Sequence, residues 1–277
     1  ILRDPTRIQD ADLVLMESTY GDRLHRSREE TISELGEIIR GAHHERGNIL
    51  IPAFAVGRSQ DLLYFMSRHR DEWGMDDWSV FLDSPMAIEA SRVYARYAHL
   101  YDEEAAGLWN RRGRGTGLLP RFQLTRTANQ SRAINKMSSG AIILAGCGMC
   151  EGGRIKHHLK NKIWRKRCHV NIVGYQPHGT LGRRLVDGVE KIKLWGETIR
   201  VSARIHTLGG LSAHADQDGL VRWYAAFTHR PPVYLVHGET KAQEALRDRL
   251  KRDLSADVGI AEAGQIVDLR RPVRIAA

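Results

Sequence analysis

Residues 140–154 read GAIILAGCGMCEGGR, and this stretch contains the pattern that decides the fold. Five apolar residues, Ala141–Ala145, are followed by a glycine-rich loop and then by the start of a short helix. A short apolar run that ends in glycines is typical of a strand that is buried on both faces. Repeated alternation of such strands with helices predicts the α/β class, with a mostly parallel sheet covered by helices.

The same order of strand, loop and helix recurs on both sides of this stretch. Further apolar strands are predicted at residues 11–17, 48–54, 78–85 and 232–236, and at the start of residues 169–185. Helices are predicted to begin at Ser27 (with Glu30 completing a capping box), at Ser59 and near Met86, and to cover about residues 218–227 and 241–253. Residues 190–206 predict a hairpin, and residues 110–117 (NRRGRGTG) predict an exposed turn.

Length and composition limit the classes to which the protein can belong. The chain has 277 residues, of which 42% are hydrophobic and 27% are charged, as in an ordinary globular protein. No apolar run approaches the roughly 18 residues that span a membrane, and no signal-peptide pattern opens the chain. The formal net charge of +9 fits a polyanionic partner such as nucleic acid.

The three cysteines argue against a disulfide framework and for a reducing compartment, so we expect a cytoplasmic protein. Cys147 and Cys150 form a single C-x-x-C in a glycine-rich loop, and without a second pair this spacing is best explained by chance. The chain begins with Ile1 in a segment that reads as a loop, so we expect a fragment of a longer protein.

In open parallel sheets, ligands bind at the carboxyl ends of the strands, so the residues that follow each apolar run are the candidates for chemistry. Glycines, small hydroxyl residues or ionisable groups follow every run, for example at Glu17–Gly21, Asp83–Pro85 and His237–Glu239. Glycine-rich loops that lead into helices suit phosphate groups. None of these loops is a Walker A or a dinucleotide fingerprint, so the sequence indicates no nucleotide cofactor.

Thirteen histidines are many for this length, and two of them occupy places that suit chemistry. His237 directly follows a buried strand, and His214 lies in a loop of small residues, HTLGGLSAHADQDG, before a predicted helix. Together they are candidates for a metal ligand or a general acid. Among the other histidines, we expect His43, His44, His157 and His158 to be solvated and His206 to be structural. No H-x-H, H-E-x-x-H or H-x-H-x-D-H motif is present, so the sequence alone assembles no closed metal site.

Six motifs, taken in order, resemble the β-CASP branch of the metallo-β-lactamase superfamily. They are ESTYG (Glu17–Gly21), LDSPMA (Leu82–Ala87), GxGMxxGGR (Gly146–Arg154), GYQPHGTLG (Gly174–Gly182), GGLSAHAD (Gly209–Asp216) and VHGE (Val236–Glu239). This family includes ribonuclease J, related bacterial ribonucleases and the RNA-cleaving subunit of the eukaryotic 3′-end processing machinery. Each motif is modest, but the ordered set spans essentially the whole chain and is specific.

The resemblance implies a fold, a division of the chain and roles for single residues. Residues 1–21 and 211–277 correspond to parts of the metallo-β-lactamase αββα sandwich, and residues 22–210 to the inserted β-CASP domain with its parallel sheet. Glu17 matches motif A, an acid that pairs with a histidine; His214 matches motif B, near the scissile phosphate; His237 matches motif C, a zinc ligand. Candidates for contacting the substrate are Ser84, Gly148, Gly152, Gly153, Arg154, Thr180 and Ser212.

The implied activity is zinc-dependent hydrolysis of RNA phosphodiester bonds, with two zinc ions in the full-length protein. DNA-directed members of the family tend to carry valine at motif C, so His237 favours RNA. The H-x-H-x-D-H motif, another histidine and a bridging aspartate precede motif A in the family, and all would fall upstream of Ile1. We therefore expect an N-terminally truncated protein that is inactive as an isolated chain. A non-catalytic RNA-binding or scaffold relative and a DNA-directed nuclease are the alternatives, and a homodimer is left open.

The segment Arg154–His169 carries seven Lys or Arg residues together with Trp164. It could follow an RNA backbone through Lys160, Lys162, Arg165 and Lys166, with Trp164 stacking on a base. An ordinary solvated helix face with Trp164 in the core fits the sequence equally well.

Overall fold

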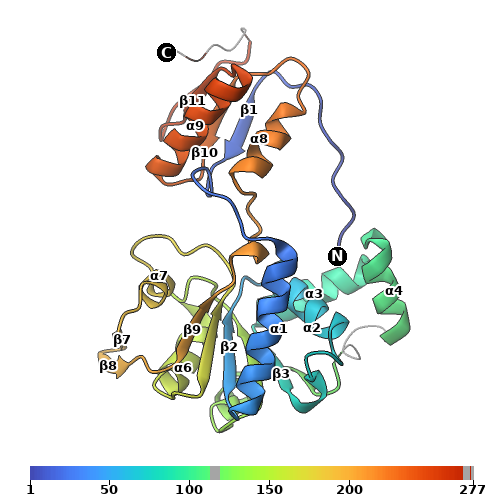
Figure 1. Ribbon diagram of the computed structural model, residues 1–277, viewed down its shortest axis with the longest axis vertical. Coiled ribbons are helices and arrows are strands. Elements are labelled where there is room, and N and C mark those ends of the chain that lie inside the picture. Colours follow the sequence, from blue (N-terminus) through green and yellow to red (C-terminus); the bar gives the residue numbers. More distant parts are fainter. Residues whose placement is uncertain (113–118, 271–274, 276–277) are drawn as a thin grey trace. The chain divides into compact units, whose positions relative to one another are not determined.

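The chain folds into two compact units in the computed structural model, which describes residues 1–112, 119–270 and 275. Unit 1 comprises Ile1–Arg3 and Arg26–Ala213, and unit 2 comprises Asp4–His25 and His214–Ala277 (Figure 1). Most of the turn predicted at residues 110–117 lies outside the described residues, and its first three residues belong to a helix. Among the described residues, no helix combines the length and the apolar character that crossing a membrane requires.

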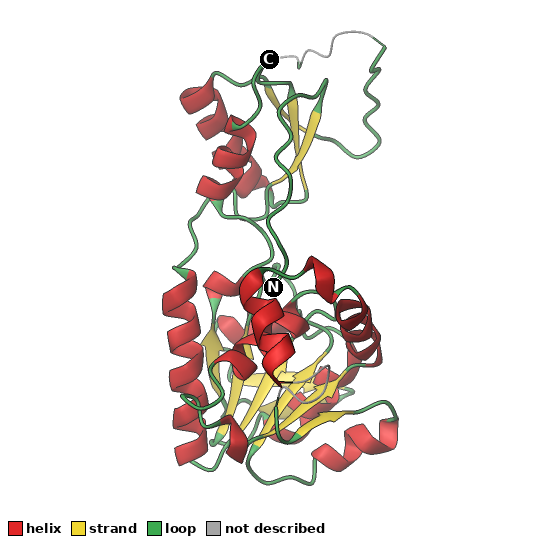
Figure 2. Ribbon diagram, turned by 90° about the vertical axis from the view of Figure 1, so that its right-hand side faces the viewer, coloured by secondary structure: helices red, strands yellow, loops and turns green. Residues whose placement is uncertain are grey.

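Unit 1 is built on a six-stranded sheet whose strands are all parallel. The strand order is β4-β3-β5-β2-β6-β9. Figure 2 shows the strands of this sheet in yellow with red helices around them. The strands are β2 (Asn48–Pro52), β3 (Ser79–Asp83), β4 (Phe122–Leu124), β5 (Ala141–Ala145), β6 (Cys168–Ile172) and β9 (Arg204–Thr207). The helices are α1 (Arg28–His44), α2 (Arg58–Arg68), α3 (Pro85–Arg96), α4 (Glu103–Arg112), α5 (Ala128–Ile134), α6 (Gly153–Lys162) and α7 (Leu181–Val186).

Apolar residues alternate between two cores, one on each face of this sheet. Ile142 and Leu144 of β5 join one core, whereas Ile143 between them joins the other, because successive strand side chains point to opposite faces. Helix α1 buries Leu35 and Ile39 in the first core, and α6 buries Leu159 in the second. This arrangement confirms the predicted α/β class with helices flanking a parallel sheet.

One local expectation is confirmed and two need correction. Ser27 caps α1 as predicted, since its side chain accepts a hydrogen bond from the backbone N–H of Glu30. Helix α2 begins one residue before Ser59, whose hydroxyl instead donates to the carbonyl of Phe54 at 2.7 Å. The predicted hairpin is confirmed for β7 (Lys191–Leu194) and β8 (Glu197–Arg200), but residues 204–207 leave it and pair as β9 with the open edge of β6.

Unit 2 holds a three-stranded parallel sheet in the order β1-β10-β11. Its elements are β1 (Val14–Glu17), α8 (Gln217–Ala225), β10 (Val233–Val236), α9 (Thr240–Leu254) and β11 (Val258–Ile260). Val14, Met16 and Leu235 pack with residues of both helices in one apolar core. Blue β1 therefore lies beside orange β10 in Figure 1, although more than 200 residues separate them in the chain.

Candidate metal and catalytic site

The register of unit 2 brings two of the predicted site residues to one edge of its sheet. Glu17 is the last residue of β1 and pairs with Val236, the last residue of the parallel strand β10. His237 follows β10 directly, so both side chains lie at the carboxyl ends of neighbouring strands. This is the edge at which parallel sheets bind ligands.

His214 reaches the same place from the segment that leads into α8. Asp216 caps this helix, accepting a hydrogen bond at 2.8 Å from the backbone N–H of Gly219. Its other carboxylate oxygen accepts from the backbone N–H of His25 at 3.2 Å. Desolvation raises the pKa of Asp216, but the two hydrogen bonds lower it by more than desolvation raises it. The pKa therefore lies below its ordinary value. The Asp216 carboxylate thus links the segment that contains His214 to the segment that follows β1.

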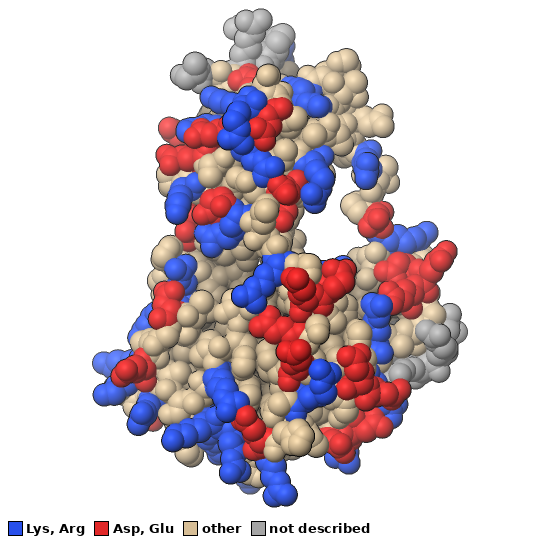
Figure 3. All heavy atoms as spheres, viewed as in Figure 1, with Lys and Arg blue, Asp and Glu red and all other residues tan. Residues whose placement is uncertain are grey.

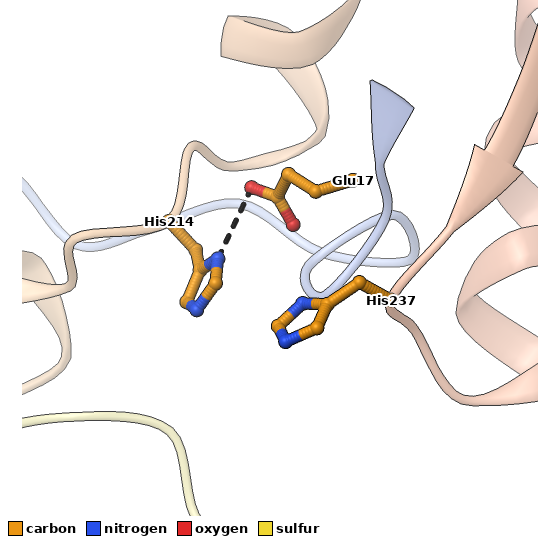
Figure 4. A group of neighbouring side chains, drawn as sticks. All are labelled: Glu17, His214 and His237. Atoms are coloured by element: carbon orange, nitrogen blue, oxygen red, sulfur yellow. Dashed lines mark ion pairs between the residues drawn. The ribbon is translucent and has the colours of Figure 1, made fainter. Parts of the chain in front are cut away.

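Glu17, His214 and His237 form one cluster (Figure 4). The Nδ1 atom of His214 lies 3.3 Å from a carboxylate oxygen of Glu17, the ion pair that Figure 4 marks. The two imidazole rings are stacked, with centroids 5.2 Å apart and planes inclined by 27°. One ligand atom from each residue lies within 4.8 Å of those of the other two. Two imidazoles and a carboxylate are donors that suit zinc.

Thr19 is a buried residue of this site that the sequence analysis did not single out. Its hydroxyl donates to the backbone carbonyl of His237 at 3.0 Å and lies 3.1 Å from Nδ1 of the same residue. The same oxygen lies 3.4 Å from Nδ1 of His214, so one hydroxyl adjoins the Nδ1 atoms of both imidazoles. If its proton goes to the carbonyl, Nδ1 of a neutral His237 donates to the hydroxyl oxygen and Nε2 keeps the lone pair that a metal needs. The place of Thr19 two residues after Glu17 in ESTYG was the available signal.

The backbone around His237 is also held in an unusual conformation. Its φ is +53°, which is uncommon for a residue other than glycine and costs of the order of 1 kcal/mol. The next residue, Gly238, lies so close to Ser18 that a Cβ there would be 2.5 Å from the Ser18 hydroxyl. That hydroxyl donates to the carbonyl of Val236 at 2.7 Å. The turn that presents His237 is therefore fixed by close packing against β1.

The other predicted substrate contacts lie in unit 1. Most are in loops that follow its parallel strands, Gly153 and Arg154 begin α6, and Ser212 is next to the last residue of the unit. Ser84 caps α3, Thr180 caps α7, and Gly152 precedes α6. The carbonyl of Gly148 accepts from Gln176 at 3.0 Å. Gly153 has φ +67°, and a Cβ there would lie 2.3 Å from a backbone oxygen. Each of these residues has a structural role, and substrate contact by them stays a prediction.

Arg154 and His158 meet a buried carboxylate in unit 1, and this arrangement corrects one expectation. His158 was expected to be solvated, but its side chain is fully buried, with Nε2 2.6 Å from Asp83. Helical spacing explains the burial, because residues 155, 158, 159 and 162 share the buried face of α6. Arg154 donates to the same carboxylate at 2.7 Å and to the carbonyls of Thr125 and Arg126.

Residues 59–185 match the model of the Beta-Casp domain, and residues 198–261 match that of the Zn-dependent metallo-hydrolase RNA specificity domain. Ribonuclease TTHA0252 of Thermus thermophilus is 37% identical over 265 residues, which cover 96% of this chain and 60% of the relative.

More distant relatives are similar over slightly less of the chain. Transcription termination factor FttA of Pyrococcus abyssi is 32% identical over 82% of this chain and 36% of the relative. The RNase J-like protein of Methanocaldococcus jannaschii is 27% identical over 86% of this chain and 55% of the relative. The chain thus spans between about a third and 60% of the length of these curated proteins.

Proposed function

This chain belongs to the β-CASP branch of the metallo-β-lactamase superfamily, and we propose that it is part of a zinc-dependent hydrolase of RNA phosphodiester bonds. The observation that carries the proposal is the cluster of Glu17, His214 and His237 at the carboxyl edge of the unit 2 sheet. Residues 1–21 and 211–277 would belong to the metallo-β-lactamase sandwich, and residues 22–210 to the β-CASP domain.

The donor set of the cluster fits zinc, and His237 is the residue that would hold it. Its side chain is exposed, and the Thr19 hydroxyl adjoins its Nδ1, so Nε2 is the atom available for coordination. When bound, zinc acts as a Lewis acid toward phosphoryl oxygens and lowers the pKa of a water molecule. Two zinc ions belong to the proposal, the further ligands coming from sequence that would precede Ile1.

His214 would move the proton that the reaction needs. Glu17 lies 3.3 Å from its Nδ1, so the carboxylate orients the ring. A protonated His214 could then donate from Nε2 to the oxygen that leaves the scissile phosphate. Glu17 is itself held by the backbone N–H of Thr19, which donates to its second carboxylate oxygen at 2.8 Å.

RNA is the substrate class that the motifs favour. His237 stands where DNA-directed relatives tend to carry valine, and the family model over residues 198–261 is described by its RNA specificity. A cytoplasmic location also belongs to the proposal, supported by the three free cysteine thiols. The homodimer left open by the sequence is to be checked by sedimentation.

The test is RNA cleavage with added zinc, measured on this chain and on an extended protein that adds any coding sequence upstream of Ile1 to it. We expect cleavage by the extended protein and none by the shorter chain. His214→Ala should lower the rate by about 10²- to 10⁴-fold, the usual contribution of a general acid. His237→Ala should lower zinc affinity by at least about tenfold, measured by isothermal titration.

Lys251→Gln, on the exposed surface of α9, provides a control that should leave both measurements unchanged. RNA binding without cleavage by the extended protein would contradict the hydrolase and favour the scaffold alternative. Cleavage of single-stranded DNA in preference to RNA of the same sequence would favour the DNA-directed alternative instead.

A further inference from the structure

We propose that unit 1 carries a second, non-catalytic contact for single-stranded RNA at the amino ends of its parallel strands, centred on Trp164. The identity of the polyanion rests on the proposed function, whereas the surface itself is defined by unit 1 alone. The contact lies at the opposite edge of the sheet from the glycine-rich loops, and no catalytic residue belongs to it.

The surface contains a hollow of about 560 Å³. Three connections form it: the loop that enters β2, the loop that enters β5, and the segment from α6 to β6. The lining residues are Arg46, Asn48, Ser138, Ser139 and Trp164–Cys168. We name this set the amino-edge hollow. Its walls combine cations, small hydroxyl groups and one aromatic ring.

The cations of the amino-edge hollow lack acidic partners. Arg46, Lys166 and Arg167 are exposed, and within the described part of the chain no Asp or Glu pairs with them or with Arg165. The Nε atom of Arg165 is buried and has no hydrogen-bond partner there. Figure 3 shows Lys and Arg side chains gathered at the bottom of the view, below β2 and α6 of Figure 1. Uncompensated positive charge in a hollow attracts a polyanion.

Two of the cations that the sequence placed on this surface do not belong to it. Lys162 is fully buried, and its ammonium donates to the carbonyl of Met137 at 2.7 Å. Arg154 is bound to Asp83. Lys160 stays on the surface, where it pairs with Glu197, so the hollow and not the whole basic segment is the region of unpaired charge.

Trp164 is the feature that separates this surface from an ordinary basic patch. Its side chain is 52% exposed, which overturns the alternative that placed it in the core; Ile163, one position earlier, takes that place. The guanidinium of Arg165 lies 5.0 Å from the centroid of the ring. An exposed indole with a cation over it leaves a face on which an unpaired base can stack.

A second exposed tryptophan continues the surface along α6. Trp195, in the β7–β8 turn, is 53% exposed and stacks on His157 with centroids 4.6 Å apart. Lys156 and Lys160 lie 5.5 and 5.8 Å from its centroid. His157 and Lys160 lie on α6, which ends at Lys162, and Trp164 follows two residues later in the turn that leads to β6. Aromatic rings alternating with cations are typical of single-strand binding.

The test measures binding of a fluorescein-labelled oligouridylate in EDTA, which excludes metal-dependent cleavage. Lys166→Gln/Arg167→Gln should weaken binding about tenfold near 0.1 M salt and make the salt dependence shallower by about 1.4 in log–log slope, for two phosphate contacts. Lys251→Gln/Arg252→Gln removes the same two residue types from the exposed part of α9 and should change neither quantity. Equal effects of the two double variants would overturn the proposal.

The aromatic part is tested with Trp164→Ala and Trp164→Phe. The alanine variant should bind the oligouridylate about tenfold more weakly, while phenylalanine should retain most of the affinity. Inorganic polyphosphate has charge but no bases, so Trp164→Ala should leave its binding unchanged. Equal loss with both probes would show a purely electrostatic patch and reject the stacking. Binding is measured in EDTA and cleavage by the extended protein is measured with zinc, so failure of the hydrolase proposal and failure of this one are distinguishable.

Discussion

Two carboxylate–histidine pairs of this protein have the same chemistry and opposite surroundings. In unit 1, Asp83 and His158 are both fully buried and lie 2.6 Å apart. In unit 2, Glu17 and His214 are 28% and 35% exposed at their side chains and lie 3.3 Å apart. A carboxylate beside a histidine therefore indicates a site for chemistry only where the pair stays accessible to a ligand.

The Asp83 carboxylate is saturated by donors from its own unit. Thr125, Ser131, His158 and Arg154 all donate to it, at 2.5 to 2.7 Å. Burial raises the pKa of Asp83, but the four hydrogen bonds outweigh burial and hold the pKa at about 2. The carboxylate has no acceptor capacity left for a substrate, so this network stabilises the fold. The Glu17 pair, by contrast, adjoins the exposed imidazole of His237.

The largest expected effect comes from removing the buried carboxylate. Asp83→Ala should lower the free energy of unfolding by about 3–5 kcal/mol, because the charged Arg154 and the buried His158 lose their partner. Urea unfolding followed by tryptophan fluorescence checks this, since Trp73 and Trp78 are buried in unit 1. A loss below about 1 kcal/mol would contradict the structural role of the network.

A smaller effect is expected from acid. The folded-state pKa of Asp83, about 2, lies below the 3.8 of an ordinary aspartate. Its contribution is therefore present above about pH 4 and is lost as the pH falls toward 2, in total about 2 kcal/mol. Unfolding free energies of the wild-type protein and Asp83→Asn, compared from pH 6 to pH 2.5, should converge. A constant gap between the two proteins would exclude this titration.

The smallest effect on stability is expected at the accessible pair. Glu17→Gln should change the free energy of unfolding by less than about 0.5–1 kcal/mol, because a partly exposed ion pair contributes little. The rate of RNA cleavage by the extended protein, measured in parallel, should nevertheless fall severalfold, because no carboxylate then orients His214. A stability loss as large as that of Asp83→Ala would mean that the two pairs are equivalent, and the comparison would fail.

Sequence patterns predicted β1, β2, β3, β5, β6 and β10, since short apolar runs between glycine-rich loops reflect burial on both faces. They did not predict the three-residue edge strands β4 and β11, and they assigned β9 to a hairpin. Glu17 and His237 were candidates because they end or follow strands of a parallel sheet, His214 because of its small-residue loop, and their roles came from the family resemblance. Helical spacing alone is enough to predict the burial of His158, although its polar neighbours suggested a solvated position. The same spacing places Lys162 on the buried face of α6, whereas Trp164 follows the end of that helix, so helical spacing did not predict its exposure.

The sequence by itself determined the α/β class, the alternation of elements and the ordered motifs, because each depends on residues that are neighbours in the chain. Only the tertiary structure decided which polar groups are accessible. Asp83 meets donors from β4, α5 and α6 across tens of residues, and Thr19 meets His237 across 218 positions. Burial and hydrogen-bond partners depend on such distant contacts, so they separate the structural carboxylate from the one that remains available for chemistry.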